Sequence, residues 1–352
     1  MSSASSRPRA LICGVSGQDG AYLAKLLLDR GYEVIGTSRD AQMASFDNLK
    51  KLGIYERISL ESMAINDFRS VVGVMRKASP QEVYNLAGQS SVALSFQQPV
   101  ETLESISVGT LNLLEAIRFL GAPIRFYNAG SSECFGDTQG EGATEEHPFR
   151  PRSPYAVAKA AAFWQVANYR EAYNLFACSG ILFNHESPLR PARFVTRKIV
   201  AAACRIAAGS GEVLRLGNTG VQRDWGWAPE YVEAMWLMLQ KDQPSDFVIA
   251  TGQCHSLEAF VAAAFDAVGL TWKNHVESDH SLIRPTEISF GRGNPVKANR
   301  DLGWKARHDM HFVVRMMVEA ERAVPGEKSG LDLRAWLRSP VIPASSSQRS
   351  EQ

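Results

Sequence analysis

Short apolar runs alternate with amphipathic stretches through the first half of this 352-residue chain. The apolar runs predict strands at 10–14, 33–37, 58–63, 82–87, 125–129 and 177–183, and the amphipathic stretches predict helices near 20–30, 67–78, 101–120, 155–173 and 194–208. Such alternation is typical of βαβ units, in which helices cover both faces of a parallel sheet. The sequence therefore predicts an α/β fold with a Rossmann-type doubly wound parallel sheet.

The pattern changes after about Asn184, where loops lengthen and Arg, Trp and Pro gather in clusters. Short strands at 213–216 and 247–250 and helices at 229–240, 256–268 and 309–323 are still predicted. We interpret 9–184 as a cofactor-binding domain with interleaved later segments, and 185–335 as a smaller C-terminal substrate-binding lobe. Residues 1–8 and 336–352 are expected to be disordered tails.

Composition narrows the class of protein. Apolar residues make up 45% of the chain and charged residues 21%, with a net charge of +1, so nothing in the charge balance favours nucleic acid or an anionic membrane. No apolar run approaches the roughly 20 residues of a membrane span. The five cysteines show no Cys-x-x-Cys spacing and the histidines no HExxH pattern. We predict reduced thiols, no metal site and a cytoplasmic location.

The first candidate site is a glycine-rich turn. Gly14, Gly17 and Gly20 lie between the first predicted strand and the first predicted helix. Glycines allow a tight turn and a close approach to a pyrophosphate, which binds the free amides at a helix N-terminus. The turn predicts a dinucleotide site, and the stretch 37–40 predicts which dinucleotide. Arg39 follows a small residue at the end of the second strand, which favours the 2′-phosphate of NADP.

The second candidate site is the pair Tyr155 and Lys159, four residues apart on a predicted helix. A nearby ammonium stabilises a phenolate, so the pair predicts a phenol pKa below its usual value of about 10 and a base for a substrate hydroxyl. Ser131, after the strand at 125–129, is expected to orient that hydroxyl. A simple oxidation needs no carboxylate, so Glu133 beside these groups predicts proton removal at a neighbouring carbon.

Ligands of parallel sheets lie outside the carboxyl ends of the strands. The glycine turn, 85–89 and 129–133 all fall there and are expected to form one site. Arginine and lysine suit a diphosphate, and Arg190, Lys198, Arg223 and Arg284 are the candidates. Asn184 and Glu287 offer hydrogen bonds to a sugar or a base.

The glycine turn with the Tyr155–Lys159 pair resembles the extended short-chain dehydrogenase/reductase family, and within it the GDP-mannose 4,6-dehydratases. The likeness runs from about residue 9 to 323, through the stretches 14–20, 82–90, 151–159, 180–188, 194–198 and 223–226. Asn184-His-Glu-Ser-Pro188 and Phe194-Val-Thr-Arg-Lys198 are the stretches most specific to this subgroup.

The resemblance implies three sets of site residues. The implied catalytic residues are Ser131, Ser132, Glu133, Tyr155 and Lys159. The implied NADP contacts are Gly14, Ser16, Gly17, Gln18, Asp19, Gly20, Arg39, Ser62, Met63, Leu86, Ala87, Gln89, Tyr155, Lys159, Leu182, Asn184, His185 and Arg190. The implied contacts with a GDP-sugar are Ser90, Glu133, Asn184, Lys198, Leu216, Gly217, Arg223, Arg284 and Glu287.

The implied reaction is redox-neutral. Tyr155 takes the C4 hydroxyl proton of GDP-D-mannose, NADP takes the C4 hydride, Glu133 serves the loss of water across C5 and C6, and the hydride returns to C6. The alternatives are a GDP-heptose 4,6-dehydratase, a C4 reductase or epimerase, and a catalytically silent NADP-binding regulator.

Three stretches depart from the pattern of the subgroup, and one of them is Ser62-Met63, which replaces an acidic residue expected near the adenine. The loop after Arg39 lacks the subgroup's second arginine and serine run, and in the subgroup that loop reaches a neighbouring subunit. The altered loop argues against assuming the subgroup's tetramer and its strict NADP preference, so the resemblance implies a homodimer or a homotetramer. In Pro191-Ala-Arg193 no glycine follows the arginine, so an altered sugar or base pocket is expected.

Overall fold

The computed structural model describes residues 7–138, 140 and 142–323. Of the tails predicted at 1–8 and 336–352, only residues 7 and 8 are described. Seven parallel strands form the central sheet of this region, in the order β11-β6-β5-β4-β1-β2-β3. Their bounds are β1 (Arg9–Cys13), β2 (Glu33–Ser38), β3 (Ser59–Ser62), β4 (Glu82–Asn85), β5 (Arg125–Ala129), β6 (Ala177–Leu182) and β11 (Phe247–Ile249).

Helices cover both faces of this sheet, as predicted. One face packs against α1 (Gln18–Asp29), α2 (Asp47–Lys51), α9 (Ala228–Leu239) and α11 (Val296–Leu302), and the other against α3 (Phe68–Ala78), α6 (Gly109–Leu120) and α7 (Pro154–Tyr173). Successive strand residues enter different cores: Ile12 joins the α1–α9 side and Leu11 the α3–α6 side. The Rossmann-type α/β fold is thus confirmed, and β11 and α9 are later segments interleaved with the first half.

The predicted helix at 101–120 is divided. It consists of α5 (Pro99–Leu103), a π-helical turn η2 (Glu104–Val108) and α6. The Ser105 hydroxyl in this turn accepts a hydrogen bond from the Gln89 amide (3.2 Å), and a Cβ on Gly88 would lie 2.9 Å from Ile106. Single π turns are common next to functional sites, and this one supports the loop that follows β4.

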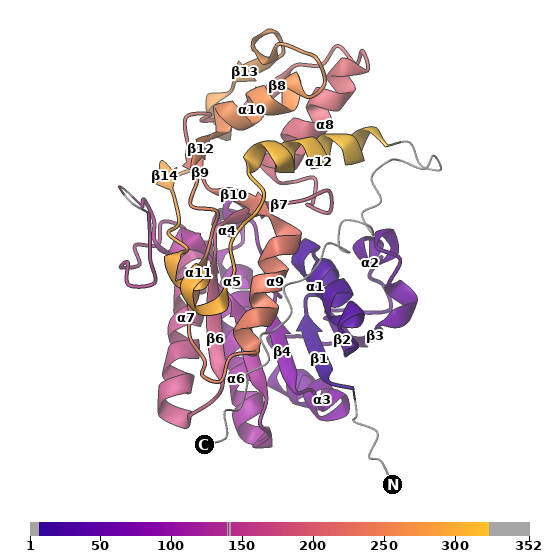
Figure 1. The fold of residues 1–352 in the computed structure, drawn as a ribbon, viewed down its shortest axis with the longest axis vertical. Coiled ribbons are helices and arrows are strands. Elements are labelled where there is room, and N and C mark those ends of the chain that lie inside the picture. The colour runs from indigo at the N-terminus through magenta and orange to yellow at the C-terminus, as the bar shows by residue number, and fades with distance from the viewer. Residues whose placement is uncertain (1–6, 139, 141, 324–352) are drawn as a thin grey trace, which may run out of the picture.

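The C-terminal lobe lies beyond the carboxyl ends of the strands (Figure 1). Its core packs between α8 (Val195–Ala207), α10 (Leu257–Asp266) and α12 (Met310–Arg322). Its short strand pairings are β7 (Asn184–Glu186) with β10 (Trp225–Trp227), β8 (Leu214–Leu216) with β13 (Val276–Ser278), and β9 (Gln222–Arg223) with β12 (His255–Ser256) and β14 (Phe290–Gly291). The remaining short elements are η1 (Tyr55–Arg57), α4 (Val92–Gln97), η3 (Ser132–Cys134), η4 (Trp272–Asn274) and η5 (His280–Leu282).

No helix among the described residues combines the length and the apolar character that crossing a lipid bilayer requires. The same residues hold no group of three or more His, Cys, Asp or Glu side chains arranged to bind a metal ion.

Candidate active site

The glycine turn is closely packed at the carboxyl end of β1. Gly14 has φ +85°, and a Cβ there would lie 2.9 Å from the Leu86 carbonyl oxygen. A Cβ on Gly20 would lie 2.4 Å from the Gly14 oxygen, so neither position tolerates a side chain. Gly17 is the N-cap of the 12-residue helix α1, without a side-chain cap, which leaves amides at its N-terminus for an anion. This cradle fits a dinucleotide pyrophosphate.

The residues predicted to be catalytic meet beside this turn. The Tyr155 hydroxyl is hydrogen-bonded with Ser131. The Lys159 ammonium donates to the Ala129 carbonyl oxygen at the end of β5 (2.7 Å) and lies 5.9 Å from the Tyr155 ring centroid. Ser153, the N-cap of α7, accepts from the Ala156 amide (3.1 Å) and fixes the first turn of the helix that carries the pair.

The predicted lowering of the phenol pKa is wrong, because the pKa of Tyr155 is raised. Burial raises the pKa of Tyr155, and the hydrogen bond with Ser131 offsets only part of that increase. The physical reason is the position of the ammonium, which is directed at the Ala129 carbonyl oxygen rather than at the phenol. Burial also lowers the pKa of Lys159, to about 8.

Glu133 follows Ser131 in the short helix η3 and is partly accessible. Burial raises the pKa of its carboxyl group, while the charges of Arg223 and Arg284 oppose that rise. Arg223 is held by the carbonyl oxygens of Gln222 (2.9 Å) and Ile288 (2.8 Å), and burial lowers its pKa. The structure therefore brings a carboxyl group with a raised pKa and two candidate diphosphate cations into one electrostatic cluster.

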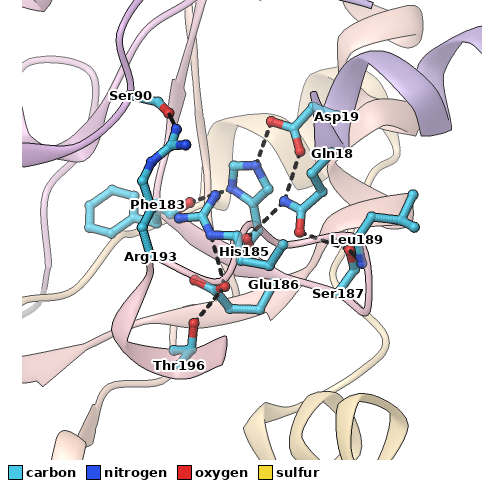
Figure 2. A network of polar contacts seen from close by, with 11 residues as sticks. Gln18, Asp19, Ser90, Phe183, His185, Glu186, Ser187, Leu189, Arg193 and Thr196 are labelled. Carbon is cyan, nitrogen blue, oxygen red and sulfur yellow. Dashed lines mark hydrogen bonds and ion pairs between the residues drawn. The ribbon is translucent and has the colours of Figure 1, made fainter. Parts of the chain in front are cut away.

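A second network joins the start of α1 to β7 (Figure 2). The His185 Nε2 atom lies 2.9 Å from an Asp19 carboxylate oxygen, and Nδ1 lies 2.7 Å from the Phe183 carbonyl oxygen. Both partners only accept hydrogen bonds, so both contacts are satisfied only by the imidazolium form. Burial lowers the pKa of His185, but the Asp19 carboxylate outweighs burial and the net pKa is raised.

The neighbours of this pair form the rest of the network. Gln18 donates to the His185 carbonyl oxygen (3.2 Å) and accepts from Ser187 (2.7 Å). Arg190 forms an ion pair with Glu186 (3.0 Å), which also accepts from Thr196 (2.8 Å). The predicted NADP contacts of Gln18, Asp19, His185 and Arg190 stay predictions.

The other predicted cofactor residues line the ends of the strands. Ser16 is exposed in the glycine turn, and Met63 and Leu182 are buried after β3 and at the end of β6. Leu86 and Ala87 contact the Gly14 position, and Gln89 donates to Thr102 (3.1 Å). Ser62 accepts from the Ala41 amide (2.9 Å). The Arg39 side chain is 78% exposed and pairs with Glu101 (3.1 Å), so it is accessible to a phosphate.

The predicted substrate residues fall into separate groups. Arg284 lies 3.7 Å from Glu287, next to Arg223 and Glu133. Lys198 instead donates to the Arg215 carbonyl oxygen (2.9 Å), beside Leu216 and Gly217 in the lobe. Asn184 pairs with Trp225 in the β7–β10 ladder, Ser132 begins η3, and Ser90 is exposed after β4.

Sequence reasoning missed Asp224. Its buried carboxylate accepts from the Thr251 amide (2.9 Å), the Thr251 hydroxyl (2.7 Å) and the Gly252 amide (2.8 Å), and burial raises its pKa to about 6. These bonds tie the segment that carries Arg223 to the chain after β11. The sequence feature that could have pointed to Asp224 is its position in Arg223-Asp-Trp-Gly226, where an acid lies between an arginine and a tryptophan that the structure buries.

The sheet, the glycine cradle and the Ser131–Tyr155–Lys159 group define an extended short-chain dehydrogenase/reductase. A UDP-glucose 4-epimerase from Thermus thermophilus, solved in complex with NAD, superposes with a TM-score of 0.79 at 26% identity, over 89% of this chain and 99% of that chain.

The family model for GDP-mannose 4,6 dehydratase matches residues 11–317. GDP-mannose 4,6 dehydratase 1 of Arabidopsis thaliana is 46% identical, over 90% of each chain. The GDP-mannose 4,6-dehydratase of Sinorhizobium fredii is also 46% identical, over 90% of this chain and 97% of the relative. The chain belongs to the GDP-mannose 4,6-dehydratase family.

Proposed function

We propose that the protein converts GDP-D-mannose to GDP-4-dehydro-6-deoxy-D-mannose with loss of water, as a nucleotide-sugar 4,6-dehydratase. The observation that carries this proposal is the carboxyl group of Glu133, which lies next to the Ser131–Tyr155 hydrogen bond and in the field of two arginines. A dehydrogenase needs the serine, tyrosine and lysine, whereas an elimination also needs a group that moves a proton at C5.

In the first step Tyr155 is the base for the C4 hydroxyl. Ser131 holds that hydroxyl by hydrogen bonding, and the lysine ammonium lies behind the ring. A nicotinamide dinucleotide held at the glycine cradle of Gly14 and Gly20 would supply the acceptor for the C4 hydride and the donor that returns it to C6. Loss of the hydroxyl proton to Tyr155, together with loss of the C4 hydride, would leave a ketone at C4 and make the C5 proton acidic.

In the second step Glu133 acts on C5 and C6. Its carboxylate takes the C5 proton, and the carboxylic acid so formed gives a proton to the departing C6 hydroxyl, which leaves as water. A group that must accept and then donate works best with a pKa near the operating pH. The raised pKa of Glu133 supports this double role, and the opposing charges of Arg223 and Arg284 limit the rise.

The choice of NADP over NAD rests on Arg39. Its exposed guanidinium follows β2, where a 2′-phosphate is expected, and its partner Glu101 is also largely exposed. A weak surface ion pair is readily exchanged for a phosphate contact. The complex of the Thermus epimerase with NAD supports a nicotinamide cofactor of either kind.

The nucleotide sugar is proposed to lie between the strand ends and the lobe. Arg223 and Arg284 suit the diphosphate, Asn184 and Glu287 suit polar edges of the sugar and the base, and Lys198 serves a more distant part of the ligand. A GDP-heptose is an alternative substrate, because the proposed sugar contacts of Asn184 and Glu287 do not define the C6 substituent.

The assembly proposed is a cytoplasmic homodimer or homotetramer. Large apolar side chains support an interface on the α5–α7 face, since Trp164 is 62% exposed, Val100 68% and Val157 49%. Sedimentation velocity would give the number of subunits.

The direct test is incubation of the protein with GDP-mannose and NADP. A 4-keto product that has lost the C6 hydroxyl, formed without net NADPH, is the expected result. Steady NADPH accumulation with the C6 hydroxyl retained would contradict the proposal and indicate a dehydrogenase.

A further inference from the structure

Arg193 crosses from the lobe to the loop after β4. It precedes α8, and its Nη2 atom donates to the Ser90 hydroxyl at 3.3 Å, a contact between residues 103 positions apart. Figure 2 shows the Arg193 side chain reaching toward Ser90, on the opposite side of the network from Asp19 and Gln18. The guanidinium therefore lies where the two sides of the proposed substrate site meet.

Most nearby arginines are neutralised by an acid, and Arg193 is not. Arg190 pairs with Glu186, and Arg197 pairs with Glu321. Among the described residues, no carboxylate lies within ion-pair distance of the Arg193 guanidinium. The Ser90 hydroxyl that accepts its hydrogen bond is uncharged and lies at long distance. It therefore compensates the charge of the guanidinium only weakly.

A second positive charge makes this position more favourable for an anion. The guanidinium carbons of Arg190 and Arg193 lie 3.7 Å and 5.1 Å from the centroid of the same Phe194 ring. Partial burial lowers the pKa of Arg193, and the charge of Arg190 lowers it further. Glu186 is the one carboxylate paired with these two guanidinium groups in the described structure, so the local charge is positive.

We propose that Arg193 is a further substrate-binding residue, which exchanges its bond to Ser90 for the diphosphate of the nucleotide sugar. A guanidinium offers donors in a planar fork that matches phosphate oxygens and has no acceptor for a sugar hydroxyl proton. The inference deepens the proposed function and rests on it for the identity of the nucleotide sugar.

A diphosphate has two sources at this site, the nucleotide sugar and the dinucleotide cofactor. The cradle at Gly14–Gly20 and the amides of α1 fit the pyrophosphate of a dinucleotide. Arg193 instead reaches the Ser90 hydroxyl, on the side of the network opposite Asp19 (Figure 2). The geometry therefore favours the nucleotide sugar, and binding measurements distinguish the two sources.

The test compares Arg193→Gln, Arg193→Lys and the control Arg118→Gln by titration calorimetry. Arg118 is paired with Glu115 on α6, at a distance from the proposed contacts, and removal of its charge controls for net charge. We expect Arg193→Gln to weaken GDP binding about 10–100-fold, the effect of losing charge-assisted hydrogen bonds, and Arg193→Lys to weaken it less. Guanosine and NADPH should bind to Arg193→Gln within about 2-fold of wild type, on the scale of a surface contact.

Two results would overturn this proposal. One is an unchanged affinity of folded Arg193→Gln for GDP, and the other is a loss of NADPH affinity with GDP affinity retained. Circular dichroism establishes that each variant is folded. Wild-type turnover of GDP-mannose tests the proposed function separately: if the wild type binds GDP but does not dehydrate GDP-mannose, the function fails and the Arg193 result still stands.

Discussion

The proposed catalytic pair and the proposed substrate cations are held by different means. Tyr155 and Lys159 lie on the first turns of a long helix, and the lysine is fixed to a strand carbonyl oxygen. Arg223 and Arg284 belong to short strands and loops of the lobe, and the ion pair of Arg284 with Glu287 is 3.7 Å long. The proposed base and its lysine thus lie on one long helix, whereas the proposed substrate cations lie on short strands and loops of the lobe.

The largest effect is expected from Tyr155→Phe, which removes the proposed base and leaves the ring. We expect kcat to fall by about 10³–10⁴-fold, at the upper end of what general base catalysis supplies. Rapid-quench analysis of one turnover gives the rate of chemistry. A fluorescence titration with NADPH is the control. Its affinity should be unchanged, because the phenylalanine ring fills the place of the tyrosine ring. A variant that retains a tenth of the wild-type rate would remove Tyr155 from the mechanism.

Glu133→Gln separates the oxidation from the elimination. The amide keeps the shape but neither accepts the C5 proton nor protonates the C6 hydroxyl, so we expect dehydration to slow by about 10²–10³-fold. Reduced cofactor should then accumulate on the enzyme during a turnover and absorb light as NADPH. A C4 reductase or epimerase would keep most of its rate in this variant, and that outcome would favour the alternative function.

Arg223→Gln tests the proposed substrate cations of the lobe. Its guanidinium is buried and bonded to two carbonyl oxygens, and it faces Glu133. We expect KM for GDP-mannose to rise about 10-fold or more through loss of charge-assisted bonds. A smaller fall in kcat should follow, because Glu133 loses a cation that lowers its pKa. If kcat fell by as much as in Glu133→Gln with KM unchanged, the division into catalytic and binding sides would be wrong.

The sequence predicted the elements of the catalytic side closely. The strand at 125–129 is found with the predicted bounds, since every residue from Phe126 to Ala129 is buried between helices. The strand predicted at 82–87 ends at Asn85, because Leu86 and Ala87 leave the sheet to pack against Gly14. Local apolar pattern determines where a strand lies, but its functional end depends on a neighbour far along the chain.

Other features depend on contacts that no local pattern encodes. The π turn faces Gly88, which lies before α4, and the Asp19–His185 pair joins positions 166 residues apart. The pKa of Tyr155 differs from the prediction because the four-residue spacing does not show how deeply the phenol is buried, nor that the Lys159 ammonium bonds the Ala129 carbonyl oxygen. The role of Arg193 likewise depends on Ser90.

The smallest effect is expected from His185→Gln, which tests how the cofactor helix is tied to the lobe. The imidazolium faces Asp19 from α1, Arg190 and Glu186 from its own segment, and Tyr231 from α9, on which its ring stacks. Because its folded-state pKa is raised, this contribution to stability is fully present below the unfolded value of about 6.5 and is lost as pH rises through the folded pKa.

We therefore expect wild type to melt a few °C above His185→Gln at pH 6, since about 1 kcal/mol shifts the midpoint by that amount in a large domain. The difference should shrink as pH rises above the folded pKa of His185. Asp19→Asn should remove the same pH dependence, because the carboxylate is what raises the pKa. Differential scanning fluorimetry across pH measures both variants. A gap that grows with pH would mean that His185 is neutral in the folded protein and that the tie between α1 and β7 is not ionic.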